Sequence, residues 1–393
     1  FPHLISFMLN MVNGSLQSEL SRFFQVVKNK PITSEGVTPA AFCKARKKFS
    51  FTAFKALNNC LTEILYKSKS VSLWNGFRLL AVDGSVVLLP ESDELYEYFG
   101  KSRAFSSHPS ARLSQLYDVS NNISVDVQVA PHSVGERTMA LRHLEHAKEG
   151  DLILYDRGYP AVWLFILHQQ KNVDFCARVI EDGSNVYKEF ANSNKPEATI
   201  TLPCIEKSLR KCKLLGLPTS PIKVRLVRVD LGNGNYEILA TSLRDRCQFP
   251  RKIFKDLYHQ RWFVEEDYKL MKSRLEMENF TGLSAEAIMQ DIHAKVLTKN
   301  LAAVAILEAD VIAREKYKGR QHEYRINFTY ALSQLKDNII RFTLCLADAD
   351  LTALLIKQIA KAVDAVRHDR KFVREKDRMR KRIKRHYISY KRV

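Results

Sequence analysis

The chain has 393 residues, of which 46% are hydrophobic, so it can bury a sizeable core and is too long for a single compact unit. Lys and Arg number 62 against 43 Asp and Glu, and the net charge of +19 favours a polyanionic partner, either nucleic acid or an anionic membrane surface. These values exclude a disordered chain, and the absence of any apolar run of roughly 18 residues excludes a membrane-spanning helix.

Residues 1–70 predict short helices joined by loops. Thr38 is placed as an N-cap and Pro39 at the first helical position, ahead of apolar and basic residues at helical spacing. Such a segment is typical of a compact helical DNA-binding unit, and equally typical of a packing helix with a basic outer face. The chain begins at Phe1 rather than methionine, which is compatible with a missing N-terminal piece.

The middle of the chain predicts a mixed α/β sheet. A nearly continuous apolar strand runs from Phe77 to Pro90, and two further strands in residues 111–131 are joined by a turn at Asn121-Asn122. The elements expected next are a helix over 135–150, a strand over 151–156, a helix over 161–171 and a strand over 173–179.

A β-rich segment follows this sheet. Residues 173–246 contain the strand patterns "IKVRLVRVDL" and "YEILATSL", joined through "GNGN", which is typical of a hairpin. The chain must therefore return to the sheet from beyond an insertion.

Two aspartates stand out because of the apolar strands around them. Asp83 interrupts "FRLLAVDGSVVLLP", and Asp156 ends the strand in "DLILYDRGYP". Burying a carboxylate costs free energy unless a cation meets it, and a metal ion is a suitable partner. The alternative is that both are ordinary strand-end or turn aspartates. Asp126 illustrates that alternative, because it alternates with valines in "ISVDVQV" and is expected to face solvent.

The stretch "YHQRWFVEEDYKLMKSRLEMENFTG" predicts one helix from Tyr258 onward. At 100° per residue, four polar side chains fall on one face about 60° wide: Tyr258, Arg261, Glu265 and Lys272. An apolar stripe packs the helix on the core beside this face, and Glu266 lies away from it. The alternative is a solvated amphipathic helix with an ordinary Arg261–Glu265 ion pair.

The three acidic motifs, taken in order, carry a resemblance to a known family. The spacing Y-(2)-R-(3)-E-(6)-K resembles the YREK signature of DDE transposases in insertion sequence family four, and "AVDGS" and "YDRGYP" are similar to its two aspartate motifs. The similarity covers roughly residues 77–310. It implies an α/β, RNase H-like core, a mixed sheet with flanking helices, interrupted by the β-rich insertion and accompanied by helical N- and C-terminal segments.

By that resemblance, Asp83, Asp156 and Glu265 would be both catalytic residues and metal ligands. Two Mg²⁺ ions, for which Mn²⁺ would substitute, need hard oxygen ligands of this kind in phosphodiester displacement. Water would cut the end of the transposon, and the freed 3′ hydroxyl would join target DNA. The resemblance thus implies a DNA transposase that binds inverted-repeat ends and performs cleavage and strand transfer.

The same resemblance assigns Tyr258, Arg261 and Lys272 to DNA contact near the active site. Arg157 is a further candidate for DNA contact, and its alternative role is to cap the strand end by pairing with an acid. The expected partners are double-stranded DNA, at the inverted-repeat ends and at the target, and a second copy of the chain in a homodimer on paired ends. The sequence contains no phosphate-binding loop, so ATP chemistry is not expected. The expected location is the bacterial cytoplasm, at the nucleoid.

The expected organisation has five segments. They are a helical DNA-end-binding segment (1–70), the first part of the catalytic core (71–172), the β-rich insertion (173–246), the second part of the core (247–310) and a helical segment with a basic tail (311–393). The tail from Val366 holds 13 basic and 3 acidic residues, typical of a phosphate-tracking arm or a solvated helix. Two other functions stay open: an Mg²⁺-dependent nuclease without strand transfer, and a catalytically inactive DNA-binding derivative.

Overall fold

The computed structural model describes residues 1–393 except 11–13, 32–35, 69–70, 102–107, 233 and 367–393. The chain forms two compact units. The sheet unit comprises residues 72–86 and 112–269, and the helical unit comprises residues 1–71, 87–111 and 270–393. The predicted basic arm lies outside the described residues beyond Val366. Within the described part of the chain, no helix has both the length and the apolarity to cross a membrane.

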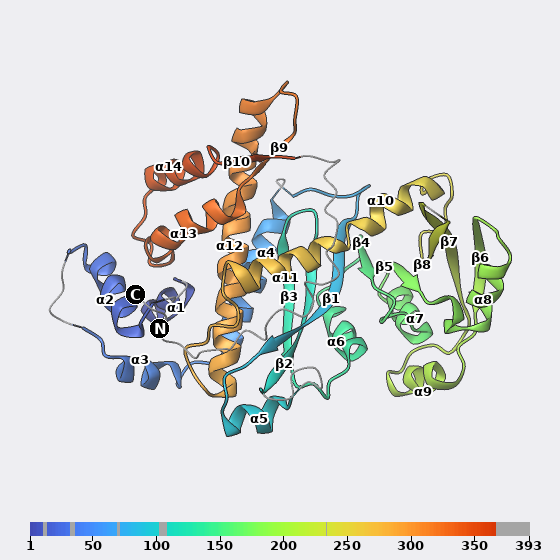
Figure 1. The fold of residues 1–393 in the computed structure, drawn as a ribbon, viewed down its shortest axis with the longest axis horizontal. Helices are drawn as coiled ribbons and strands as arrows, with labels where there is room; N and C mark the ends of the chain where they lie inside the picture. Colours follow the sequence, from blue (N-terminus) through green and yellow to red (C-terminus); the bar gives the residue numbers. More distant parts are fainter. Residues whose placement is uncertain (11–13, 32–35, 69–70, 102–107, 233, 367–393) are drawn as a thin grey trace. The chain divides into compact units, whose positions relative to one another are not determined.

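The sheet unit contains most of an eight-stranded mixed sheet (Figure 1). Its strands follow in the order β3 (Ile123–Ala130), β2 (Ser110–Asp118), β1 (Arg78–Leu88), β4 (Asp151–Tyr155), β5 (Asp174–Val179), β8 (Asn235–Thr241), β7 (Ile222–Gly232) and β6 (Glu197–Leu202). β1, β4 and β5 run parallel, whereas β2 pairs antiparallel with β3, and β5, β8, β7 and β6 pair antiparallel in turn. The predicted mixed α/β sheet is confirmed, and the strands of the β-rich segment extend it beyond β5.

β1 and β4 form the buried centre of this sheet. Residues 79–82 and 152–155 are completely buried, as expected of strands covered on both faces, which appear in sequence as continuous apolar runs. The two strands are aligned at their starts by an ion pair, in which Arg78 Nε lies 2.8 Å from Asp151 Oδ1. The strand register is therefore fixed by a buried charge pair as well as by the backbone ladder.

A buried polar cluster attaches α6 (Glu136–His143) to β2 and β3. His143 Nδ1 lies 2.7 Å from Asp126 Oδ2, and its Nε2 lies 2.9 Å from Ser114 Oγ. Asp126 is 4% exposed, so the expectation that it faces solvent is wrong. Apolar and polar side chains do alternate between the two faces of β3, but both faces are covered. On the polar face, His143 and Gln128 form hydrogen bonds with the Asp126 carboxylate.

α7 (Val162–Gln170) packs on β4 and β5 through largely buried side chains. His168 Nε2 lies 2.9 Å from the Tyr155 hydroxyl, and its Nδ1 lies 3.0 Å from Val173 O. The first bond joins the helix to the end of β4, and the second joins it to the residue that precedes β5. The remaining elements of this unit that precede the acidic helix are η1 (Glu181–Gly183), α8 (Asn185–Asn192), α9 (Glu206–Leu214) and η2 (Arg251–Ile253).

The helix predicted from Tyr258 onward is interrupted. α10 (Phe254–His259) ends before a turn at Gln260 and Arg261, and α11 (Trp262–Ser273) begins after it. In the turn, Gln260 N bonds to Leu257 O and Arg261 N to Tyr258 O, which is the tighter i to i−3 pattern. The expectation of one continuous helix is therefore wrong at this turn.

The helical unit is built around the long helix α12 (Ala285–Tyr317). Its other elements are α1 (Pro2–Leu9), α2 (Leu16–Lys28), α3 (Pro39–Arg46), α4 (Thr52–Lys67), α5 (Asp93–Phe99), α13 (Phe328–Thr343), α14 (Ala349–Ile359) and the antiparallel pair β9 (Tyr324–Ile326) and β10 (Val363–Ala365). The predicted cap of α3 is confirmed, because Ala41 N donates to Thr38 Oγ1 at 3.2 Å. Arg46 does not lie on a basic outer face, since it is buried and paired with Asp291 at 2.9 Å.

Candidate active site

Strand register places Asp83 and Asp156 beside each other. Val82 in β1 is paired with Tyr155 in β4, and each aspartate is the residue that follows. Neighbouring strands lie about 4.8 Å apart, so both carboxylates emerge at the same end of the parallel pair. Both residues are half-buried, which follows from their place at the edge of the completely buried strand segments.

Two tyrosines attach the acidic helix to the backbones of these strands. Tyr258 Oη in α10 donates to Tyr155 O at 3.3 Å, and Tyr268 Oη in α11 donates to Asp83 O at 2.9 Å. Glu265 lies between the two tyrosines in the chain, one helical turn before Tyr268. The hydrogen bonds therefore hold Glu265 against the end of the sheet where Asp83 and Asp156 emerge.

Arg261 pairs with two of the three predicted catalytic acids. Its Nη2 lies 2.9 Å from Glu265 Oε1, and its Nη1 lies 3.8 Å from Asp83 Oδ2. The Arg261 side chain is almost fully buried, and its guanidinium also lies over the rings of Tyr258 and Trp262, at 5.9 and 5.1 Å from their centroids. The predicted Arg261–Glu265 pair is thus present, as one part of a larger charge cluster.

The acids of this cluster influence one another. The pKa of Asp83 is raised to about 6, chiefly by burial. The negative charges of Glu265 and Asp156 act in the same direction, whereas the Gly84 N–H and the Arg261 charge oppose them. Three partly buried carboxylates that repel one another form a site that a positive charge would stabilise.

The donor chemistry of this site fits a divalent cation. Carboxylate oxygens are the ligands that Mg²⁺ and Mn²⁺ prefer. Within the described residues, no three His, Cys, Asp or Glu side chains lie close enough together to hold one ion. Arg261, between Asp83 and Glu265, supplies the positive charge in this arrangement.

The four residues predicted to contact DNA lie in different surroundings. Arg157 is exposed in the turn after Asp156, and Arg261 is buried among the acids. Tyr258 is 3% exposed and its hydroxyl bonds to β4, so its expected contact with DNA stays a prediction. Lys272 lies seven residues after Glu265 in α11, hence on the same face of that helix, and burial lowers its pKa.

Sequence reasoning missed three residues that belong to these surroundings: Tyr268, Glu136 and Glu237. Burial raises the pKa of Glu237 in β8, the charges of Arg178 and Arg261 oppose the shift, and Asp156 adds to it. The helical spacing of Tyr268, one turn after Glu265, could have identified it. Glu136 and Glu237 give no such signal, because an acid in the first turn of a helix or in an alternating strand is ordinary.

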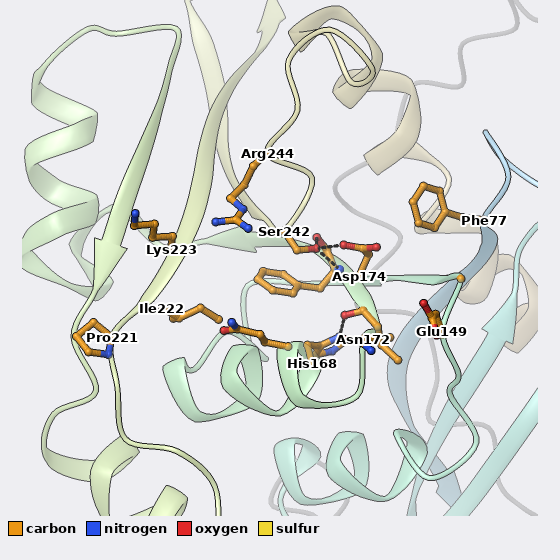
Figure 2. Close-up of a pocket in the computed structure, with 14 residues that line it drawn as sticks. Phe77, Glu149, His168, Asn172, Asp174, Pro221, Ile222, Lys223, Ser242 and Arg244 are labelled. Carbon is orange, nitrogen blue, oxygen red and sulfur yellow. Dashed lines mark hydrogen bonds between the residues drawn. The ribbon is translucent and has the colours of Figure 1, made fainter.

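A groove of about 790 Å³ lies at the other end of the same strands. Figure 2 shows it between Arg244 and Lys223 on one side and Glu149 on the other, with Ser242 donating to Asp174 at 2.7 Å. Gly150, which precedes β4, lines the groove, whereas Asp156 follows β4, roughly 20 Å away along the strand. No predicted site residue lines this groove, so the carboxylate cluster remains the candidate active site.

Comparison with known proteins identifies similar chains. Residues 74–301 match the family described as "Transposase DDE domain". The chain is 21% identical over 277 residues to "Transposase InsG for insertion sequence element IS4" of Escherichia coli (strain K12), covering 69% of this chain and 62% of that protein. It is 26% identical over 136 residues to "Putative transposase InsZ" of the same strain, covering 33% of this chain and 44% of that protein.

These matches cover less than two thirds of the length of either relative. Among solved structures, a piggyBac transposase synaptic complex with hairpin DNA is similar with a TM-score of 0.44 and 10% identity, over 91% of this chain and 75% of that one. A TM-score of 0.44 is too low to assign site residues by structural comparison. The match to the family covers Asp83, Asp156 and Glu265 together.

Proposed function

Since the chain belongs to the transposase DDE domain family, we propose that it is a DNA transposase that cleaves the inverted-repeat ends of an insertion sequence and transfers them to target DNA. The observation that carries this proposal is the place of Asp83 and Asp156 at the same end of two parallel strands, with Glu265 linked to Asp83 through Arg261. A packing or surface role would not require Asp83 to lie where burial and the charges of Glu265 and Asp156 raise its pKa.

In the proposed mechanism, Asp83, Asp156 and Glu265 would hold the divalent cations. Mg²⁺, or Mn²⁺ in its place, supplies when bound the charge that activates the attacking oxygen and stabilises the leaving one. Tyr268 fixes the backbone that carries Asp83, and Arg78 fixes the register that sets Asp83 beside Asp156. The chain's own contribution is thus a preorganised set of carboxylates on rigid strands.

The proposed DNA contacts surround these acids. Arg261, Lys272 and Arg157 would hold phosphates beside the scissile bond and position it without reading sequence, and Tyr258 would complete the set. The net charge of +19 supports binding to double-stranded DNA, both at the inverted-repeat ends and at the target. A homodimer on paired ends and a location at the nucleoid in the cytoplasm belong to the same proposal.

The predicted five segments remain part of this proposal. Residues 1–70 would bind the element's end, residues 71–172 and 247–310 would form the catalytic core around the insertion at 173–246, and residues 311–393 would add the basic tail. The net charge of the tail, together with the excess positive charge of the rest of the chain, supports binding along the DNA backbone.

Strand transfer separates the proposal from a nuclease. The test incubates the full chain with Mn²⁺ or Mg²⁺, a DNA end carrying the inverted repeat that flanks the gene, and a labelled target plasmid. A transposase gives both cleaved ends and ends covalently joined to the plasmid. Cleaved ends without joined product would contradict strand transfer and leave the nuclease, whereas DNA binding without cleavage would leave a DNA-binding derivative.

A further inference from the structure

Glu136, in the first turn of α6, lies between the two segments that carry the catalytic aspartates. A methyl group at Gly84, beside Asp83, would lie 3.5 Å from Glu136 Oε1, and one at Gly158, in the turn after Asp156, would lie 3.7 Å from Oε2. The two carboxylate oxygens of Glu136 therefore face one aspartate segment each. All of these residues belong to the sheet unit.

Two hydrogen bonds and one buried cluster fix this position. Arg112 Nη1 donates to Glu136 Oε1 at 3.0 Å, and Arg137 Nε donates to Gly158 O at 3.0 Å. At the other end of α6, His143 is bonded to Asp126 in β3. The helix backbone that carries Glu136 is thus held at both ends, and the bond to Arg112 directs the Glu136 side chain.

An unpaired hydroxyl points to a polar ligand at the same place. Tyr159 is 2% exposed, and its hydroxyl has no hydrogen-bond partner within the described residues. Burial raises the pKa of Tyr159, and the charges of Asp83, Glu136 and Asp156 add to the rise, so all three acids act on this hydroxyl. A buried hydroxyl without a partner destabilises the fold, and an incoming polar group would remove that cost.

We propose that Glu136 is a fourth carboxylate of the site, whose negative charge strengthens binding of the divalent cation that Asp83, Asp156 and Glu265 would hold. The inference rests on the proposed function for the identity of the cation. Glu136 acts through its charge and is not itself a ligand of the cation, since it faces both aspartate segments and is bonded to Arg112. Arg112 offsets part of the Glu136 charge. Removing the Glu136 carboxylate therefore weakens cation binding and does not abolish it.

The test measures Mn²⁺ binding to the full chain without DNA, by titration calorimetry. Glu136→Gln keeps the shape of the side chain and its bond to Arg112, and removes the charge. It is expected to bind Mn²⁺ about tenfold more weakly than the native chain, the order expected for one partly screened charge near the ion. Glu136→Asp restores the charge and is expected to bind with an affinity close to the native one.

Two controls separate this inference from the proposed function. Glu149→Gln removes an exposed acid at the far end of β4 and is expected to leave the affinity within about twofold of the native value, since its charge is screened at that distance. Asp83→Asn is expected to weaken Mn²⁺ binding more than Glu136→Gln. If Glu136→Gln binds Mn²⁺ with native affinity while Asp83→Asn binds weakly, the role of Glu136 is overturned and the proposed function stands. If the native chain does not bind Mn²⁺, both proposals are overturned.

Discussion

Arg261 is the residue whose surroundings say most about the site. It is 5% exposed and forms ion pairs with Asp83 and Glu265, two acids that the proposed mechanism assigns to cation binding. The Arg261 charge opposes the rise that burial causes in the pKa of Asp83, and the two ion pairs hold Asp83 and Glu265 on either side of one guanidinium. Removing one partner of a buried pair would leave an uncompensated charge. The same guanidinium would be well suited to hold a DNA phosphate when cations bind the two carboxylates.

Tyr268→Phe tests whether the backbone of Asp83 must be fixed. The substitution removes the 2.9 Å bond from Tyr268 Oη to Asp83 O and is expected to lower the free energy of unfolding by about 1 kcal/mol. We expect kcat for DNA cleavage to fall about tenfold with unchanged DNA affinity, because misplacing a catalytic carboxylate slows the reaction without removing a DNA contact. Tyr236→Phe, which removes the exposed bond from Tyr236 Oη to Glu181 Oε2 at 3.0 Å, is the matched control and should leave kcat unchanged. An unchanged kcat in Tyr268→Phe would contradict this role.

At the scale of elements, β1 and β4 could be predicted because their apolar runs are long and each ends or breaks at an aspartate. The spacing of Arg261 and Glu265 likewise predicted their ion pair correctly. The interruption between α10 and α11 could not be predicted, because helical periodicity continues across a single tight turn. The burial of Asp126 was also missed, since alternation within β3 does not reveal that His143 of the next element, α6, covers the polar face.

His168 makes the joint between α7 and β4 sensitive to acid. Burial lowers the pKa of His168 from 6.5 to about 4, so the unfolded chain binds the proton more readily between these values. Stability from neutral His168 is complete above about pH 6.5 and is lost as the pH falls toward 4. Over that interval the native chain should lose up to about 3 kcal/mol more than His168→Gln in urea unfolding. The control is His259→Gln, at an exposed histidine, which should lose as much unfolding free energy over this pH interval as the native chain. A loss of the native size in His168→Gln would contradict the prediction.

At the scale of the whole molecule, charge is the property that the sequence establishes most directly. The stretch from Val366 onward has 13 basic and 3 acidic residues, so it carries 13 − 3 = 10 of the 19 excess positive charges. The remaining excess belongs to residues 1–365. Composition favoured a polyanionic partner without distinguishing DNA from a membrane, and the acidic motifs together with the family match favour DNA.

Deleting residues 367–393 tests the arm. Each phosphate contact releases counterions, so losing the arm should weaken DNA binding and reduce the slope of log K against log salt concentration. Fluorescence anisotropy with duplex DNA at several salt concentrations measures both quantities. A truncated chain with the affinity and salt slope of the full chain would show that these residues do not track phosphates.

The central claim is that Glu265 acts with Asp83 and Asp156 in cleaving DNA at the element's ends. It is tested most directly by comparing Glu265→Gln with Glu266→Gln, because the adjacent acid Glu266 is exposed and pairs with Lys269. The measurement is cleavage of inverted-repeat DNA with Mn²⁺, together with DNA affinity. We predict that Glu265→Gln binds and does not cut, while Glu266→Gln does both. Equal cleavage by the two variants would contradict the account.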